Sequence, residues 1–293
     1  MILARVLLLF TVITWGWTFV ATKICLYYLT PLELIGLRLL IGLPVLLIIV
    51  AIKRVKFEFN GHWRALVIGS LIIAAHFLIQ ITGIKYTSAT NTGWIIAMCP
   101  LVTAALAYLI LKEKIGRSTR VGIGVATAGI LFLVSKGSFA RLDWLQSIGD
   151  WLVLASAHTW ALYTIATRDL SRSGNPLTVI IAILTPTALL ALGTMAFTSD
   201  WPLFIHLPPR ALLALAFLGF LGTALAHWFW QIGVAKLGAA RAGIFLYLEP
   251  LATTALAVPY LHESFGLFTA IGGLLVLIGV WYAQRKPRPR LQN

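Results

Sequence analysis

The sequence has little charge. Only 11% of its 293 residues are charged, whereas 60% are hydrophobic, and a soluble globular domain carries about 25% charged residues. Acidic residues are scarcest, with nine Asp and Glu against 23 Lys and Arg. A soluble fold of this length would have too few charged side chains for its surface, so the composition excludes that class and indicates a membrane protein.

Cysteine is equally scarce, and the motifs of common enzyme classes are missing. The two cysteines, Cys25 and Cys99, lie in or beside apolar runs without metal-ligand spacing, so we expect packing roles, no metal and no cofactor. The chain has no Gly-x-Ser-x-Gly elbow, no His-Glu-x-x-His and no phosphate loop. These absences argue against an intramembrane enzyme and against a primary pump in a single chain.

Long hydrophobic runs are what the sequence has in abundance. A membrane-spanning helix needs about 20 mostly apolar residues. Ten such spans are predicted, near 3–22, 32–52, 64–83, 90–111, 119–136, 147–167, 177–198, 210–231, 239–260 and 265–284. No gap between them is long enough for a soluble domain. We therefore predict an all-α integral membrane protein with ten transmembrane helices, which functions as a monomer.

The basic residues predict an orientation in the membrane. With the N-terminus in the cytoplasm, 17 Lys and Arg residues fall on the inner side and five on the outer side, while Arg38 lies inside a span. Cytoplasmic loops carry such an excess of basic residues, so both termini are expected in the cytoplasm. Topology thus accounts for the net charge of +14; the expected partners are a lipid bilayer and a small-molecule substrate, and not nucleic acid.

The chain repeats itself. Residues 75–81 match 226–232 at an offset of 151, with His and Gln in the same places, and Pro100-Leu101 matches Pro250-Leu251 at an offset of 150. The first helix matches the sixth at an offset of 145. We predict two five-helix repeats, 1–140 and 141–293, the second ending in a short basic cytoplasmic tail. Because five is odd, the second repeat is inverted, which is typical of secondary transporters with a site near the midplane.

The order of these motifs resembles a known family. The Trp15-Gly16 opening, the Pro-Leu pairs of the fourth and ninth helices, and a Glu-x-x-Gly before a glycine-rich last helix in each half are similar to the EamA type of the drug/metabolite transporter superfamily. The resemblance covers the whole chain and implies a bacterial inner-membrane protein with a central cavity. Within the superfamily, the length and the aromatic-rich helices most resemble the YddG-type exporters of aromatic amino acids.

Two histidine–glutamine pairs are the first candidates for a substrate site. His76 and Gln80, and likewise His227 and Gln231, lie one helical turn apart, so each pair shares a helix face. Polar groups at this depth are costly unless they face the protein interior or a water-filled cavity. They hydrogen-bond a zwitterionic substrate, one His shuttles a proton, or they join helices structurally. His158, beside Trp160 and Tyr163, has the same alternatives.

Other candidates are charged residues and prolines within spans. Glu249 is the one acid deep in a span, and it serves as a proton site, as a partner for a substrate amine, or as a neutral structural acid. Arg38 either extends to the outer interface or attracts a substrate carboxylate or closes an outer gate. Pro100 and Pro250 mark matching break points, which suit gating and cavity lining or a purely structural kink.

Aromatic residues within spans complete the predicted cavity. Tryptophans at helix ends form ordinary interface belts, but several here lie mid-span, where stacking suits aromatic or flat cationic solutes. The aromatic candidates are Trp17, Trp94, Trp160, Tyr163, Trp228 and Tyr247. The sequence thus predicts a secondary transporter that exports aromatic amino acids or related metabolites. The alternatives are broad drug or metabolite efflux and a facilitative, channel-like carrier.

Overall fold

The computed structural model describes residues 1–57, 62–134, 145, 147–261 and 267–284, and all regular structure in these residues is helical. The helices up to residue 134 are α1 (Ile2–Leu26), α2 (Pro31–Lys53), α3 (Trp63–Tyr86), α4 (Ala89–Ile96), α5 (Cys99–Leu109) and α6 (Arg117–Val134). The later ones are α7 (Ile148–Ser173), α8 (Pro176–Thr198), α9 (Trp201–Ile205), α10 (Pro209–Phe217), η1 (Leu218–Leu225), α11 (Ala226–Leu237), α12 (Ala239–Gly243), η2 (Ile244–Leu248), α13 (Glu249–Leu261) and α14 (Leu267–Ala283).

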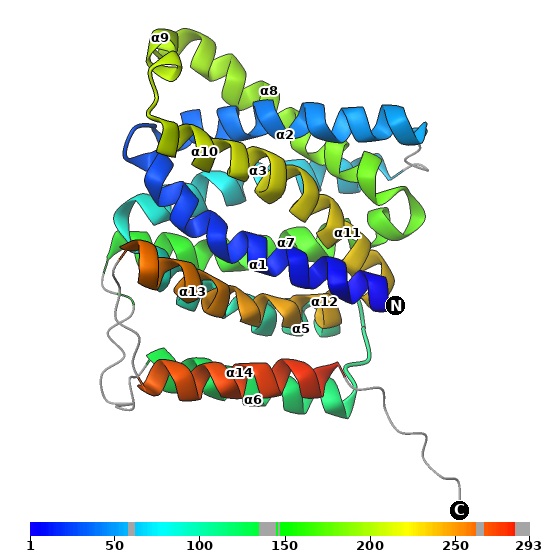
Figure 1. Ribbon diagram of the computed structural model, residues 1–293. Coiled ribbons are helices and arrows are strands. Elements are labelled where there is room, and N and C mark those ends of the chain that lie inside the picture. The colour runs from blue at the N-terminus through cyan, green and yellow to red at the C-terminus, as the bar shows by residue number, and fades with distance from the viewer. Residues whose placement is uncertain (58–61, 135–144, 146, 262–266, 285–293) are drawn as a thin grey trace, which may run out of the picture.

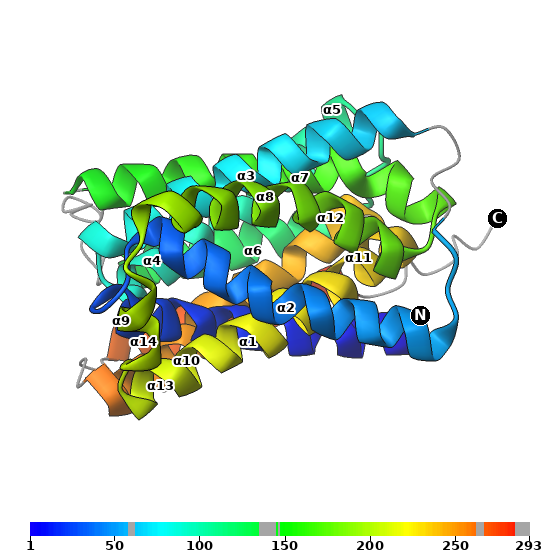
Figure 2. The ribbon, with the colours of Figure 1, turned by 90° about the horizontal axis from the view of Figure 1, so that it is seen from above.

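Within the described residues, seven helical stretches are long and apolar enough to cross a membrane. They are α1, α2, α3, α4 with α5, α8, α10 with η1 and α11, and α12 with η2 and α13. Helices α6, α7 and α14 run roughly parallel to them (Figures 1 and 2) and lie at the other three expected spans. The prediction of an all-helical, multi-pass membrane protein is confirmed.

Local sequence signals set where the helices begin. Thr30 caps α2: its hydroxyl accepts from the Glu33 backbone N–H, and the Glu33 carboxylate accepts from the Thr30 N–H at 2.8 Å. Pro31 follows at the first helical position, where a missing N–H does no harm. Asn175 and Pro176 start α8 in a similar way. Helix ends that are capped by their own side chains leave fewer backbone groups unsatisfied beside an apolar bilayer.

Two helix pairs lie at opposite edges of the bundle. Helix α2 packs on α8 at one edge, and α6 packs on α14 at the other (Figure 1). Glycines permit the second contact, because a Cβ at Gly122 would lie 2.5 Å from the Gly279 carbonyl and one at Gly129 would lie 2.8 Å from the Gly272 carbonyl. Between the edges, α1 packs on α11 and α3 packs on α7.

Three spans are interrupted near their centres. The fourth expected span breaks between α4 and α5, just before Pro100, and the ninth narrows to the 3₁₀ segment η2 just before Pro250. Proline cannot donate to the carbonyl four residues earlier, which belongs to Ile96 or Leu246. The backbone is thus irregular beside both prolines, and a role of these points in gating stays a prediction. The third interruption, the π-helix η1, was not predicted from the sequence.

Candidate functional site

A cavity lies at the centre of the bundle, where the interrupted helices meet the continuous ones. The space between its lining atoms is about 450 Å³, and part of this space is open to solvent. Its lining comes from helices α1, α2, α3, α4, α5, α7, α11, η2 and α13, and consists of Trp15, Thr18, Phe19, Arg38, His76, Phe77, Gln80, Ile96, Cys99, Trp160, His227, Leu246 and Glu249. Both residues whose carbonyls the prolines release, Ile96 and Leu246, are among them, so irregular backbone occurs where it lines a cavity.

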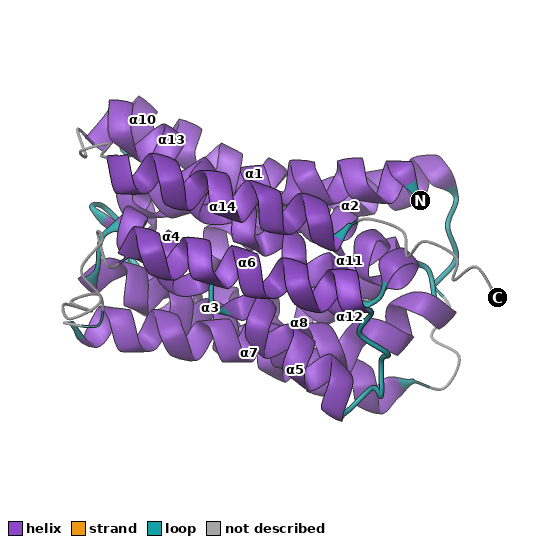
Figure 3. Ribbon diagram, turned by 90° about the horizontal axis from the view of Figure 1, so that it is seen from below, coloured by secondary structure: helices purple, strands orange, loops and turns teal. Residues whose placement is uncertain are grey.

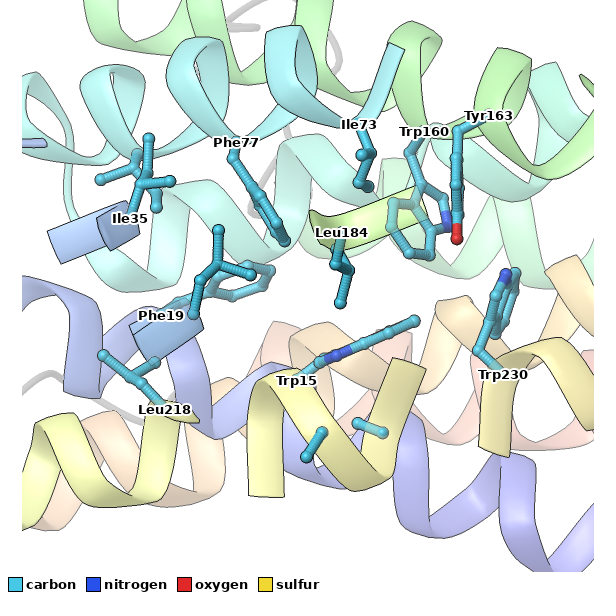
Figure 4. Packing of buried hydrophobic residues seen from close by; sticks show 14 of the residues in the cluster. Trp15, Phe19, Ile35, Ile73, Phe77, Trp160, Tyr163, Leu184, Leu218 and Trp230 are labelled. Atoms are coloured by element: carbon cyan, nitrogen blue, oxygen red, sulfur yellow. The ribbon is translucent and has the colours of Figure 1, made fainter. Parts of the chain in front are cut away.

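Aromatic rings form much of the cavity wall. The rings of Trp15 and Trp160 meet edge to face, with centroids 4.8 Å apart, and Trp15 also contacts His227 and Trp230. Phe77 faces His227 at 5.6 Å. Figure 4 shows the rings of Trp15, Phe77, Trp160 and Trp230, which come from α1, α3, α7 and α11, pointing toward one another. Edge-to-face packing of this kind holds rings rigidly and leaves flat faces for a ligand ring to stack on.

Arg38 is buried against this wall and does not extend to the helix end. Its side chain is 4% exposed; Nε donates to the Thr223 hydroxyl at 2.8 Å, and the guanidinium lies 4.9 Å from the centre of the Phe77 ring. Among the described residues it forms no ion pair. Guanidinium groups suit planar carboxylates, and a buried cation without a counter-ion is costly. The remaining N–H groups of Arg38 are thus available to an anionic ligand.

Glu249 is the other charged group in the lining. It is 2% exposed, and among the described residues its carboxyl has no hydrogen bond and no ion pair. Neither Arg38 nor any other cation of the described chain pairs with it. The cavity therefore holds one guanidinium and one carboxyl that are not matched to each other. Such an arrangement suits a ligand with both an anionic and a cationic group.

The π-helix η1 organises the second-half side of the cavity. A π-turn leaves carbonyls without their usual α-helical donors, and here the Gly222 carbonyl accepts from Trp15 Nε1 at 3.1 Å and from His227 Nδ1 at 2.9 Å. Thr223, which holds Arg38, donates its own hydroxyl proton to the Leu218 carbonyl at 2.8 Å. One irregular turn thus positions a cation, an indole and an imidazole.

Both cavity histidines are anchored through the same ring nitrogen. His76 Nδ1 lies 3.1 Å from the Ser156 carbonyl, and His227 Nδ1 lies 2.9 Å from that of Gly222. His76 Nδ1 also lies 3.1 Å from the Thr159 hydroxyl. Because a carbonyl only accepts, both carbonyl contacts are hydrogen bonds in the tautomer that carries its proton on Nδ1. His227 Nε2 and Trp160 Nε1 are buried without a hydrogen-bond partner among the described residues.

The two predicted glutamines have different surroundings. Gln80 lines the cavity, whereas Gln231 is 1% exposed and its side chain is held on both sides: it donates to the Tyr163 hydroxyl at 2.5 Å and accepts from Ser171 at 2.6 Å. Both helices have the same His-x-x-x-Gln pattern, so the sequence did not predict that only one of the two glutamines lines the cavity. The cause is the neighbouring helix, since α7 offers Tyr163 and Ser171 to Gln231.

Several predicted residues lie outside the lining. His158 is exposed and turned back to the Leu154 carbonyl of its own helix, and Trp17 is 38% exposed beside Phe217. Trp228 is half-buried and also absent from the lining. On a helix only about one face in three points inward, and these side chains occupy other faces.

Two more predicted residues are buried but belong to a separate cluster. Trp94 and Tyr247 pack with α6 and α14, and the Tyr247 hydroxyl pairs with Thr127 at 2.7 Å. Pro100 and Pro250 are buried and act through the backbone. The structure thus brings together Arg38, His76, Gln80, Trp160, His227 and Glu249 in one cavity, and their roles there stay predictions.

Some lining residues were not among the predicted site residues. Trp15, Phe19, Phe77 and Cys99 all look like ordinary packing residues in sequence. A usable signal existed for two of them, because Trp15 is the repeat counterpart of Trp160 and Cys99 is that of Glu249. No group of three potential metal ligands occurs in the described residues.

Comparison with known proteins places the chain among transporters. The profile of the EamA-like transporter family matches residues 2–135 and again residues 147–283. The uncharacterized transporter YyaM of Bacillus subtilis is 29% identical over 279 residues, covering 94% of this chain and 90% of that protein. An uncharacterized transporter of Archaeoglobus fulgidus is 29% identical over 290 residues, 96% of this chain and 97% of that protein.

A further relative carries a more specific name. A probable amino-acid metabolite efflux pump of Salmonella typhimurium is 23% identical over 285 residues, covering 94% of this chain and 92% of that protein. None of these three names specifies an aromatic solute, so they lend the YddG-type resemblance no support. A solved crystal structure shares the fold, with a TM-score of 0.78 at 21% identity over 96% of this chain and 97% of that one.

The family match covers most of the chain and agrees with the apolar helical bundle. Family and relatives are transporters, which is consistent with the lack of enzyme motifs in the sequence. The chain is a multi-pass membrane transporter and belongs to the EamA-like transporter family.

Proposed function

We propose that this protein is a secondary transporter that exports zwitterionic amino acids, with aromatic ones preferred, or closely related metabolites. The observation that carries the proposal is the central cavity, in which Arg38 and Glu249 are buried between aromatic walls and form no ion pair among the described residues. The guanidinium would bind the substrate carboxylate and the Glu249 carboxyl would bind its ammonium group. Stacking on Trp15 and Trp160 would favour a flat side chain. The name of the Salmonella relative is in keeping with this class.

Alternating access is supported by the correspondence between the two proposed repeats, 1–140 and 141–293. Exchanging the halves turns the α1–α11 contact into the α7–α3 contact, and both are present. It also turns the Gly122–Gly279 contact into Gly272–Gly129, which is present as well. The family profile matches the chain twice. In an inverted repeat, such exchange converts a site open to one side into a site open to the other.

We propose that the protein lies in the bacterial inner membrane. The distribution of Lys and Arg supports an orientation with both termini in the cytoplasm. Export down a substrate gradient needs no coupling ion. Proton coupling would need a titratable group in the cavity, and Glu249 is the candidate. The predicted monomer is kept, because the cavity is lined within one chain.

The test is uptake into proteoliposomes that hold the purified protein, with labelled tryptophan, phenylalanine and alanine in parallel. Tryptophan and phenylalanine should enter, should compete with each other and should be little affected by alanine. Uptake of none of them by correctly inserted protein would exclude the amino-acid assignment. Uptake of many unrelated cations would favour broad drug efflux instead.

A further inference from the structure

A second hollow lies at the end of the bundle that holds the N-terminus. The space between its lining atoms is about 700 Å³, part of it open to solvent. Its lining comes from the connection from α5 to α6, the last turns of α7 and the junction of α11 with α12, and Figure 3 shows these segments at the same end of the bundle. Its lining includes five cationic side chains, from Lys114, Arg168, Arg172, Lys236 and Arg241. Segments from both halves of the chain therefore build one basic site, separate from the central cavity.

The acid in this lining does not neutralise the cations. Glu113 is already engaged: its carboxylate accepts from the backbone N–H groups of Ala239 and Ala240 at 3.2 and 3.3 Å and lies 3.3 Å from Arg168. Among the described residues, Lys114, Arg172, Lys236 and Arg241 form no ion pair. Four cations thus share one concave surface without a protein counter-ion.

Membrane topology explains only part of this arrangement. An excess of basic residues on one side places cations at this end, as it does Lys53 and Lys56, which do not line the hollow. Topology does not require four unpaired cations to face the same space, where they repel one another. An anion with several oxygens would relieve that repulsion, and Lys and Arg together suit phosphate.

We propose that this hollow binds a phosphate group, carried either by an anionic phospholipid headgroup or by a free phosphorylated anion. Basic pockets between transmembrane helices are known to take lipid headgroups on the cytoplasmic side. The lining joins residues 113–119 of the first half to residues 168–241 of the second. A phosphate bound to both halves would hold this end of the bundle closed. That consequence rests on the proposed alternating access, whereas the binding itself does not.

The test measures thermal unfolding of the full-length protein, with no transport readout. One arm uses nanodiscs of phosphatidylcholine with increasing phosphatidylglycerol; the other titrates inorganic phosphate in neutral nanodiscs against chloride of equal ionic strength. The variant K114Q/K236Q removes two exposed cations of the hollow. The matched control K53Q/K56Q removes two exposed lysines from the same end of the bundle, outside the hollow. Size-exclusion profiles check that both double variants fold.

A saturable rise in Tm with phosphatidylglycerol or phosphate is expected for the wild type and for K53Q/K56Q. In K114Q/K236Q the apparent affinity should fall about tenfold or more, since each cation near the surface contributes on the order of 1 kcal/mol. A response to the lipid alone identifies a headgroup site, and a response to phosphate alone identifies a site for a soluble anion. Equal weakening in both double variants, or a response that chloride reproduces, would overturn the proposal, because general surface charge then accounts for it.

Discussion

The two halves of the chain contribute differently to the central cavity. Four pairs of counterparts line it from both halves: Trp15 with Trp160, His76 with His227, Ile96 with Leu246, and Cys99 with Glu249. Thr18, Phe19, Arg38, Phe77 and Gln80 line it from the first half alone. Their second-half counterparts are Tyr163, Thr164, Ile183, Trp228 and Gln231, and all of these except Trp228 are at most 1% exposed.

This difference has a simple geometric meaning. Helices α1 and α3 run away from the end that holds the N-terminus (Figure 1), and Thr18, Phe19 and Gln80 follow the central Trp15 and His76 along them. The cavity therefore extends toward the opposite end. At the N-terminal end, Tyr163, Gln231 and Ser171 are hydrogen-bonded in a packed layer. If the halves exchange conformations, this layer opens and the side near Gln80 closes.

The comparison also shows which functional groups occur in both halves and which occur in only one. The histidines occur in both halves, whereas Arg38 corresponds to Ile183 and Glu249 corresponds to Cys99. Both charged groups are thus present once only. A zwitterion between them would keep one orientation in either state, although the helices around it exchange roles. Four predictions probe this difference, from the largest expected effect to the smallest.

Replacing Arg38 should have the largest effect. In Arg38→Met the substrate carboxylate loses a buried, charged partner, an interaction worth 2–5 kcal/mol, so amino-acid uptake at low concentration should fall about 100-fold. Arg38→Lys should recover part of it. Proteoliposome uptake is the measurement, with the exposed Arg64→Met as control. Full uptake by Arg38→Met with unchanged KM would mean that the cation does not bind substrate.

Glu249→Gln should weaken recognition of the substrate amine about tenfold, because the carboxyl becomes an amide of similar size without charge. Competition against labelled phenylalanine distinguishes the roles: 2-phenylethylamine should compete less well than in wild type, and 3-phenylpropionate equally well. If Glu249 is instead a proton site, binding stays and the pH dependence of uptake disappears. Unchanged competition and unchanged pH dependence together would exclude both roles.

The two glutamines should respond differently to the same substitution. Gln231→Ala leaves the Tyr163 and Ser171 hydroxyls without their partner in a buried layer, which costs about 1–3 kcal/mol of stability; the Tm should fall. Gln80→Ala should keep the Tm and raise the KM, since Gln80 faces the cavity. Thermal unfolding and uptake kinetics on both variants suffice. Equal Tm losses would show that the halves are not in different environments.

Thr223→Val should have the smallest effect. It removes the hydroxyl that accepts from Arg38 Nε, and hydrogen bonds between membrane helices average about 0.6 kcal/mol. We expect a few-fold rise in KM with little change in kcat. Thr223→Ser, which keeps the hydroxyl, should behave like the wild type. A loss of kcat in both variants would assign Thr223 to the movement of η1 and not to the positioning of Arg38.

Much of the fold could be predicted from the sequence, because apolar runs and their lengths are dictated by the bilayer. Pro100 and Pro250 also marked the broken spans, since proline must interrupt helical hydrogen bonding. The π-helix could not be predicted, because 218–225 contains no proline, glycines such as Gly219 and Gly222 are common in transmembrane helices, and the hydrogen bonds that the turn makes come from Trp15 and Arg38 on other helices. Contacts with residues far away in the sequence therefore cannot be read from the segment 218–225 alone.

The site was predictable to a similar extent. Arg38, His76, His227 and Glu249 stood out because polar groups are costly inside a membrane, and all four line the cavity. Tryptophans gave no such signal, since packing and ligand binding use the same residue type, and so Trp17 and Trp94 lie elsewhere while Trp15 lines the site. The Glu-x-x-Gly motif of the second half and the basic tail fall outside the described residues.

The most direct test of alternating access is thiol labelling of Gln80→Cys and of Gln231→Cys in a C25S/C99A background that retains uptake. A membrane-impermeant maleimide is applied from one side and then from the other, with and without saturating substrate. Alternating access predicts that the two positions react from opposite sides of the membrane and that substrate changes their labelling rates in opposite directions. Labelling of both positions from the same side, with no opposed response to substrate, would contradict it.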